Sequence, residues 1–196
     1  ASYGWRADWV FTDRLGGVSQ GEYASLNLAA HVGDASADVA ANRQHVAEAL
    51  GTPSVKLAVI DAEHGNNVHE VTEEVITPAG KCDGLVTKSA GIALVALAAD
   101  CTPIVLADIK HAVVGVVHCG WRGIVAGIVP ATIDKMLGLG ATVSSISAVV
   151  GPSICADCYQ VDSDCAEQLM AVVPTAARRA SSGHWHADVG GSTCSL

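Results

Sequence analysis

Residues 92–123 read IALVALAADCTPIVLADIKHAVVGVVHCGWRG, and this stretch decides the fold. It contains three short apolar runs, at 92–98, 104–107 and 112–117, which are rich in Val, Ile, Leu and Ala and show no helical spacing. Runs of this length and composition predict buried strands. Pro103 lacks a backbone N–H, which suits the beginning of a strand rather than its middle.

Polar side chains follow two of these runs. Asp100 and Cys101 come after the first run, and His118 comes directly after the third. The end of a buried strand holds such groups rigidly, at the point where the core stops and a pocket can begin. A cysteine and a histidine at neighbouring strand ends form either a nucleophile–base pair or part of a metal site. Either residue alone is also compatible with a core position, but their concentration with Asp100 and Arg122 favours a functional site.

The composition limits the classes of function. The 196 residues carry a formal net charge of −9, and half of them are hydrophobic. This charge argues against sequence-independent binding to nucleic acid or an anionic membrane, although one or two arginines suffice to hold a small phosphate. No apolar run reaches the roughly 18 residues of a membrane span, and the first residues do not have the pattern of a secretory signal. The seven cysteines are odd in number and irregularly spaced, so we expect a cytoplasmic protein.

The rest of the chain predicts a mixed α/β (α+β) fold with buried sheets flanked by helices. Helices are expected at 36–50 with Ser36 as N-cap, at 124–137 with a break at Pro130, and at 162–172. Besides the central runs, strands are expected at 5–13, 55–60, 68–76 and 146–150, and residues 82–87 are expected to be a turn that leads into another strand. No repeat or linker divides the chain, so residues 1–196 are expected to form one domain.

Three residues are the best candidates for a catalytic metal site. A catalytic zinc takes three Cys, His or carboxylate ligands and keeps its fourth position for water or substrate. The candidates each follow an apolar run and are His64, Cys101 and His118. Their spacing matches no short zinc motif, so spacing alone does not identify the site.

Seven motifs occur in order along the chain and together indicate a family. They are TDRLGGVSQGEYASLNLAAHVGD (12–34), ANR (41–43), HG (64–65), DGLVT (83–87), ADCTPIVLAD (99–108), VHCGWRG (117–123) and GPSIxxxCYQV (151–161). They resemble the YfiH-type polyphenol oxidase/laccase-domain family, whose members are now described as purine nucleoside phosphorylases. In that family a His, a Cys and a second His bind zinc, and the matching residues are His64, Cys101 and His118. Further matching residues that the resemblance places in the pocket are Asn27, Arg43, Asp100 and Arg122.

The resemblance implies phosphorolysis of adenosine, inosine, guanosine and methylthioadenosine, together with deamination of adenosine. Purine nucleoside and phosphate are then the partners, in a monomer or small homo-oligomer. Zinc is the implied cofactor, and copper is the alternative because the family was first described as copper-dependent polyphenol oxidases. We expect Arg43 and Arg122, with Asn27, to bind phosphate and substrate. Asp100 is expected to act as a general acid/base or to orient a metal ligand.

The chain departs from the family pattern in three places. Ala62 and Glu63 precede His64 where the family usually has Gln-Val, and Cys119 replaces the alanine of His-Ala-Gly-Trp-Arg-Gly. Family members also continue beyond the region of Cys194 into a basic segment with tandem arginines. Either a segment is missing here, or the C-terminal wall of the site is incomplete.

Other readings remain open from the residues alone. Cys101 and His118 are a possible nucleophile and base of a cysteine hydrolase. His184 and His186 place two imidazoles on one strand face, as in copper oxidases, although the chain has only eight histidines. A metal-dependent module that binds nucleoside without turnover is a third class. Cys155 and Cys158 form a lone CxxC, for which the sequence favours neither a zinc knuckle nor a redox role.

Overall fold

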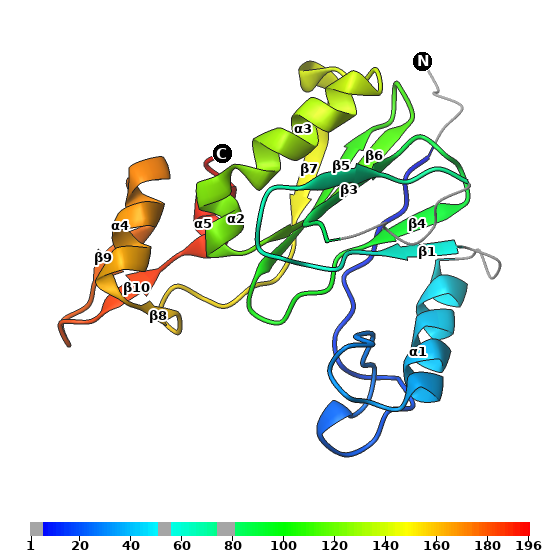
Figure 1. Ribbon diagram of the computed structural model, residues 1–196, viewed down its shortest axis with the longest axis horizontal. Helices are drawn as coiled ribbons and strands as arrows, with labels where there is room; N and C mark the ends of the chain where they lie inside the picture. Colours follow the sequence, from blue (N-terminus) through cyan, green and yellow to red (C-terminus); the bar gives the residue numbers. More distant parts are fainter. Residues whose placement is uncertain (1–5, 51–55, 74–80) are drawn as a thin grey trace.

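A five-stranded sheet forms the centre of the computed structural model, which describes residues 6–50, 56–73 and 81–196 (Figure 1). Its strands are β2 (Val68–Glu70), β3 (Gly84–Thr87), β5 (Thr102–Asp108), β6 (Val113–Cys119) and β7 (Ser147–Val150), in the spatial order β2-β3-β6-β5-β7. β6 pairs antiparallel with both β3 and β5, and β7 pairs antiparallel with β5. β2 lies parallel to β3 at the edge. The apolar runs of residues 104–107 and 112–117 are therefore the two adjacent strands β5 and β6 at the middle of the sheet.

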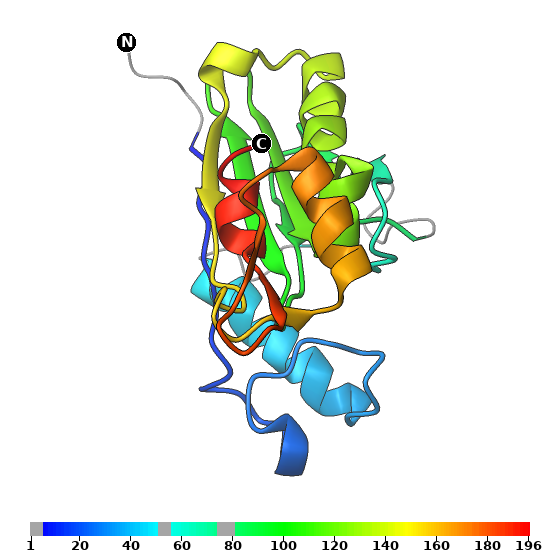
Figure 2. The same ribbon diagram turned by 90° about the vertical axis from the view of Figure 1, so that its left-hand side faces the viewer.

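Helices cover one face of this sheet (Figures 1 and 2). They are α2 (Trp121–Ala126), α3 (Ile128–Gly138) and α5 (Val189–Thr193), with α4 (Ser163–Val172) packed on α2. Side chains on strands point alternately to the two faces, so Ile104 and Leu106 on β5 and Val117 on β6 share the helical face. These residues form one buried apolar core with residues of all four helices, such as Ile124 and Leu169.

A small parallel sheet covers the opposite face. It consists of β1 (Lys56–Val59) and β4 (Ile92–Val95). Ala58 and Ile60 form a second buried core with Leu85 on β3 and Val116 on β6. The central sheet is thus buried on both sides, as its continuously apolar strands predict.

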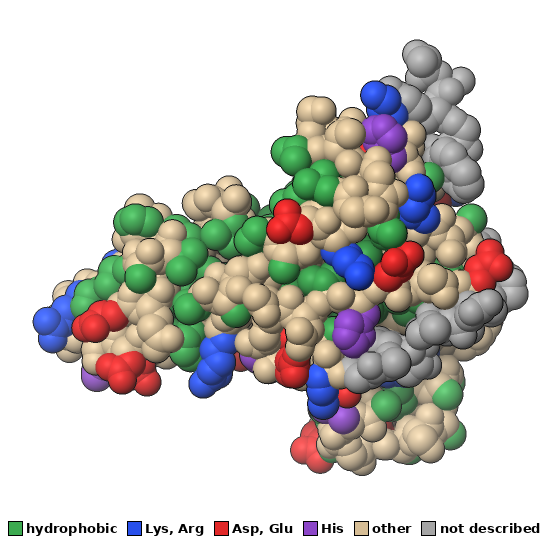
Figure 3. All heavy atoms as spheres, turned by 45° about the horizontal axis from the view of Figure 1, so that its top comes forward, with side chains coloured by type: hydrophobic (Ala, Val, Ile, Leu, Met, Phe, Trp, Pro, Cys, Tyr) green, Lys and Arg blue, Asp and Glu red, His purple; other side chains and the backbone are tan. Residues whose placement is uncertain are grey.

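A third, three-stranded sheet lies beside α4. It contains β8 (Gln160–Val161), β10 (Trp185–Ala187) and β9 (Ala177–Arg179), in that spatial order and antiparallel. A short 3₁₀ helix, η2 (Val143–Ser145), leads into β7. None of the helices in the described ranges is long and apolar enough to cross a bilayer. On the face shown in Figure 3, acidic and basic side chains of the described residues are interspersed.

A buried asparagine organises the segment before the sheets. This segment comprises a long loop with the 3₁₀ helix η1 (Gly21–Tyr23) and then α1 (Ser36–Ala49), which lie together at one end of the molecule (Figures 1 and 2). The Asn42 amide donates to the hydroxyl of Ser19 and to the carbonyls of Ser25 and Asn27, at 2.9–3.1 Å. Its carbonyl accepts the Val18 N–H at 2.8 Å. One fully buried side chain therefore satisfies loop groups that no strand pairs.

Several predicted elements are wrong in place or extent. No strand is present over residues 6–13, and Phe11 instead packs against Gly151, whose missing side chain makes room for the ring. The first apolar run is a strand only over Ile92–Val95, and the strand expected at 68–76 ends at Glu70, with 74–76 outside the described residues. Ala35, not Ser36, occupies the N-cap of α1. Residues 5 and 55, at which two of the predicted strands begin, also lie outside the described residues.

The predicted break at Pro130 is also wrong. Pro130 is the third residue of α3, where its missing N–H has no intrahelical partner to lose. The two helices are separated by Gly127, which has a left-handed backbone with φ of 81°. Glycine adopts this conformation without steric penalty, so it ends α2 and begins α3.

Replacement of this glycine tests its role. We expect Gly127→Ala to lower the free energy of unfolding by about 1–2 kcal/mol, because an L-residue is strained at this φ. Gly138→Ala is the matched control, since Gly138 is helical and a Cβ there meets nothing within 4 Å. The control should be neutral or slightly stabilising. Urea unfolding of both variants measures the difference, and equal effects would contradict the assignment.

Candidate metal centre

Three side chains from distant parts of the sequence meet at one end of the central sheet. The ligand atoms of His64, Cys101 and His118 all lie within 4.8 Å of one another. His118 is the penultimate residue of β6, and Cys101 directly precedes β5. Since β5 and β6 are antiparallel neighbours, with Thr102 opposite Cys119, the beginning of one lies at the end of the other. Cys101 therefore belongs to the start of β5, not to the end of the run at 92–98.

The three side chains grade from buried to exposed. His118 is buried, Cys101 is partly buried and His64 is exposed. The two imidazole rings are nearly perpendicular, with centroids 4.9 Å apart. Ligand atoms around a tetrahedral zinc lie about 3.5 Å apart, so small side-chain rotations suffice to bring this group to bonding distance. The graded exposure leaves one side accessible to a small molecule.

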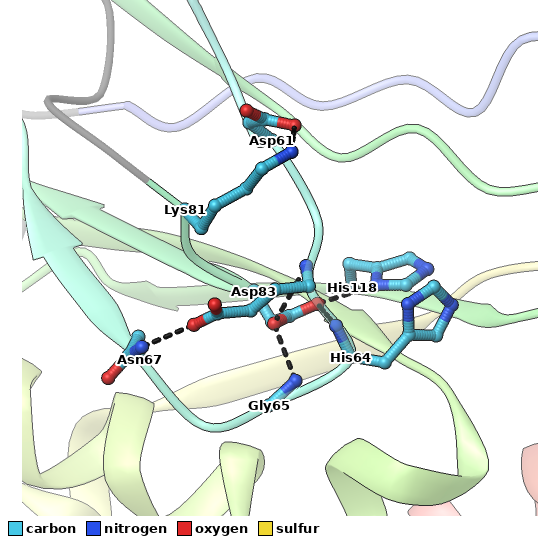
Figure 4. Close-up of polar contacts among 8 residues, drawn as sticks. Asp61, His64, Gly65, Asn67, Lys81, Asp83 and His118 are labelled. Atoms are coloured by element: carbon cyan, nitrogen blue, oxygen red, sulfur yellow. Dashed lines mark hydrogen bonds and ion pairs between the residues drawn. The ribbon is translucent and has the colours of Figure 1, made fainter.

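Asp83, fully buried just before β3, holds both histidines (Figure 4). Its Oδ1 accepts the backbone N–H of His64 at 3.0 Å and lies 2.9 Å from Nδ1 of His118. Its Oδ2 accepts the N–H groups of Gly65 and Glu63 at 2.7 and 3.3 Å. An ionised carboxylate only accepts hydrogen bonds, so Asp83 favours the His118 tautomer with its proton on Nδ1. The lone pair on Nε2 is then available to bind a metal ion.

Asp83 also explains the unusual backbone of His64. This residue has φ of 61°, a left-handed conformation that is unfavourable for a residue other than glycine. The three successive N–H groups of residues 63–65 converge on the Asp83 carboxylate, which stabilises the strained turn. Sequence reasoning missed this residue, although it is the first letter of the DGLVT motif.

A glycine makes room for the cluster. A Cβ at Gly120 would lie 2.9 Å from Sγ of Cys101 and 3.2 Å from Cδ2 of His64. The backbone at Gly120 is ordinary, with φ of −84°, so space rather than conformation explains the glycine. Two imidazoles and one thiol are a donor set that binds metal ions such as zinc, so the residues of the cluster fit a metal ion.

Cys119 lies on the other face of the sheet. Its side chain is buried in the core beneath the helices, and its Sγ accepts a weak hydrogen bond from the Thr193 hydroxyl at 3.7 Å. Burial raises the pKa of this thiol to about 11. The side chain that departs from the family pattern is therefore a neutral core residue that faces away from His118.

Two other predicted pocket residues, Asp100 and Arg122, each lie within four residues of a member of the cluster in the sequence. Asp100 is exposed, and its carbonyl accepts the Ile154 N–H at 3.0 Å. Arg122 is exposed, with its guanidinium 4.4 Å from the centroid of the Trp121 ring. Burial first, and then the charges of neighbours that include Cys101 and Asp100, raise the pKa of Tyr159, whereas Arg122 opposes this shift. Tyr159 thus lies within electrostatic reach of all three, and only its place in the CYQV motif could have indicated this.

Asn27 and Arg43 are occupied within the loop segment. The Asn27 amide donates to Oδ2 of Asp34 at 2.9 Å, and Nε of Arg43 donates to the Leu28 carbonyl at 2.9 Å. Burial lowers the pKa of Arg43. Among the described residues, no hydrogen bond or ion pair joins either side chain to the three-residue cluster. Asp100 directly precedes Cys101, and Arg122 lies two residues after Gly120, which borders the cluster, whereas Asn27 and Arg43 are hydrogen-bonded within the loop segment.

Comparison with known proteins identifies the family. A family model described as multi-copper polyphenol oxidoreductase laccase matches residues 8–194. The chain belongs to that family. A relative from Streptomyces griseus, named purine nucleoside phosphorylase ORF3, is 40% identical over 189 residues, covering 94% of this chain and 76% of the relative. Another from Mycobacterium tuberculosis H37Rv, named purine nucleoside phosphorylase Rv2149c, is 36% identical over 188 residues, covering 95% and 75%.

Solved structures of this family share the fold. YlmD from Geobacillus stearothermophilus superposes with a TM-score of 0.83 at 30% identity, covering 92% of this chain and 72% of YlmD. The Bacillus licheniformis hypothetical protein YfiH gives a TM-score of 0.82 at 28% identity, covering 90% and 71%. The family resemblance and the α+β fold class expected from the sequence are both confirmed.

The Asp83 contacts predict a specific loss of stability. Asp83→Asn replaces an acceptor oxygen by an NH₂ group that faces N–H donors, so we expect the free energy of unfolding to fall by about 3 kcal/mol. Asp61→Asn is the matched control, because Asp61 pairs with Lys81 at 2.7 Å with both side chains more than half exposed. An exposed pair contributes at most about 1 kcal/mol. Denaturant unfolding measures the free energy of unfolding of both variants. Comparable decreases in the two would contradict the role of Asp83.

Proposed function

We propose that this protein is a zinc-dependent purine nucleoside phosphorylase that acts on adenosine, inosine, guanosine and methylthioadenosine and also deaminates adenosine. The observation that carries the proposal is the open cluster of His64, Cys101 and His118 in a chain whose relatives are named purine nucleoside phosphorylases. His64, Cys101 and His118 would hold the ion. A zinc ion there would supply Lewis acidity and lower the pKa of a bound water to about 7.

The protein's own residues would position the reactants. In phosphorolysis a phosphate oxygen bonds to C1′ as the bond from C1′ to the purine nitrogen breaks, and the departing base takes up a proton. Arg122 lies two residues after Gly120, which borders the cluster, and has no acidic partner among the described residues. It is proposed to hold phosphate by charge-assisted hydrogen bonds. Arg43 and Asn27 are proposed to complete this site from the loop segment. Asp100 is proposed as the group that exchanges the proton or that orients a ligand.

Two rival activities receive less support. Burial, followed by the charges of Asp100 and Asp83, raises the pKa of Cys101, which is the opposite of what a nucleophilic thiolate requires. For a multicopper oxidase, several ligand clusters are needed. His64, Cys101 and His118 are the one group of three or more metal-binding side chains found in the described ranges. Nδ1 of His184 lies 3.3 Å from Nε2 of Gln160. Nδ1 of His186 lies 3.3 Å from the carbonyl oxygen of Ala156.

Release of free base from a nucleoside panel tests the proposal directly. We expect release from adenosine, inosine, guanosine and methylthioadenosine to require phosphate, in a sample with about one zinc per chain. Adenosine without phosphate should yield inosine and ammonia. Base release that is independent of phosphate would indicate a hydrolase, and nucleoside binding without any product would indicate a binding module.

The two cysteines near the end of β6 should differ in effect. Cys101→Ser is expected to abolish turnover and reduce bound zinc, because serine is too weakly acidic to replace a thiolate ligand. Cys119→Ala should retain most of both, since its sulfur lies in the core on the opposite face. Metal content and nucleoside turnover are measured on both proteins. Equal loss in the two would show that the wrong cysteine has been assigned.

Arg122→Ala should raise the KM for phosphate by about tenfold or more, in keeping with the loss of a charge-assisted pair. The KM for nucleoside should change much less. Arg178→Ala is the matched control. Arg178 is an exposed arginine on β9 that forms an ion pair with Asp157. Steady-state kinetics with each substrate varied separates the two constants. Unchanged phosphate dependence in Arg122→Ala and in Arg43→Ala would contradict the phosphate assignment.

A further inference from the structure

Cys155 and Cys158 form a close pair of exposed thiols that the proposed activity does not use. Their Sγ atoms are 3.0 Å apart and share a thiol hydrogen bond. Both side chains are exposed and free, unlike the buried thiols of Cys82, Cys119 and Cys165. The sequence alone favoured no redox role for this CxxC, but it could not show the two sulfurs in contact at the surface.

The backbone holds the two sulfurs on the same side of one turn. The N–H groups of Cys158 and Tyr159 both donate to the Cys155 carbonyl, at 2.9 and 3.1 Å. In such a helical turn, side chains three residues apart are neighbours. The close approach therefore follows from a hydrogen-bonded turn and not from a chance side-chain rotation.

Contacts on both sides fix this turn in the fold. Before it, the Ile154 N–H donates to the carbonyl of Asp100 at 3.0 Å, and after it, the carbonyl of Tyr159 accepts the Ala187 N–H at 3.0 Å. Within the turn, Asp157 forms an ion pair with Arg178. Backbone hydrogen bonds thus connect the turn that carries the two thiols to the segment before Cys101 on one side and to the sheet of β8, β9 and β10 on the other.

We propose that Cys155 and Cys158 are a reversible dithiol–disulfide site, modified by exchange with a low-molecular-weight disulfide. One of the two cysteines, as its thiolate, attacks one sulfur of that disulfide, forms a mixed disulfide and expels one thiolate, which takes up the proton that this cysteine released. The other cysteine then attacks the Sγ of the first as its own proton leaves, forms the intramolecular bond and expels the second thiolate, which takes up that proton. Two protein thiols are oxidised, and the small disulfide is reduced to two thiols.

Their shared hydrogen bond lowers the pKa of Cys155 and raises that of Cys158. A lowered pKa increases the thiolate fraction of one member of the pair, and the thiolate is the form that attacks a disulfide.

Titration of the full chain with mixtures of reduced and oxidised glutathione tests the site. Samples are quenched with acid, alkylated and peptide-mapped. We expect a linkage between residues 155 and 158 that reduced glutathione reverses. Cys158→Ser should stop at a glutathione adduct on Cys155, and Cys155→Ser should stop at one on Cys158, with no intramolecular linkage in either variant.

Cys194→Ser is the matched control, because Cys194 is an exposed thiol with no hydrogen bond from its sulfur to a second thiol in the described residues. The linkage should form in this variant as in the unmodified protein. Circular dichroism of every sample verifies that the chain remains folded. The proposal is overturned if the folded protein forms no linkage, or if Cys155, Cys158 and Cys194 all accumulate glutathione adducts at the same rate.

Discussion

The candidate site depends on a single buried carboxylate. Asp83 receives the N–H groups of residues 63–65 and the Nδ1–H of His118, so one side chain positions two of the three proposed ligands. A buried carboxylate is unfavourable unless it is fully hydrogen-bonded. Because four donors converge on it, the same contacts that stabilise Asp83 also determine the conformation of His64 and the tautomer of His118. Asp83 therefore connects the turn at residues 63–65 to the end of β6 through its hydrogen bonds.

Strand alternation separates chemistry from packing at the end of β6. His118 and Cys119 are consecutive, yet one faces the small β1–β4 side and the other lies in the core beneath the helices. The register between β5 and β6 places Pro103 opposite His118 and Thr102 opposite Cys119. A strand end thus presents a reactive group on one face while the adjacent residue anchors the strand on the other.

The environments of the cysteines distinguish their chemistry more clearly than their number does. Burial raises the pKa of Cys82 and Cys119 to about 11 in each case, which makes these thiols inert core residues. Cys101 stands at the boundary between core and solvent beside two histidines. Cys155 and Cys158 are exposed and in contact with each other. An odd and irregular set of thiols therefore divides into structural, ligand-like and redox-capable members.

The sequence by itself determined the family, the α+β class, the buried strands β5 and β6, and the candidates His64, Cys101 and His118. These follow from local composition and ordered motifs, which do not depend on how distant segments meet. Strand alternation also indicated that Cys119 points away from His118. Only the tertiary structure decided that Asp83 joins the histidines, that Asn42 holds the long loop, and that Gly127 rather than Pro130 divides the helices. Each of these depends on a backbone conformation or on a contact between segments many residues apart. The spacing of residues along the sequence specifies neither the backbone conformation nor the distant contact. Strand register and the connections between elements, not the neighbours in the sequence, determine which side chains meet.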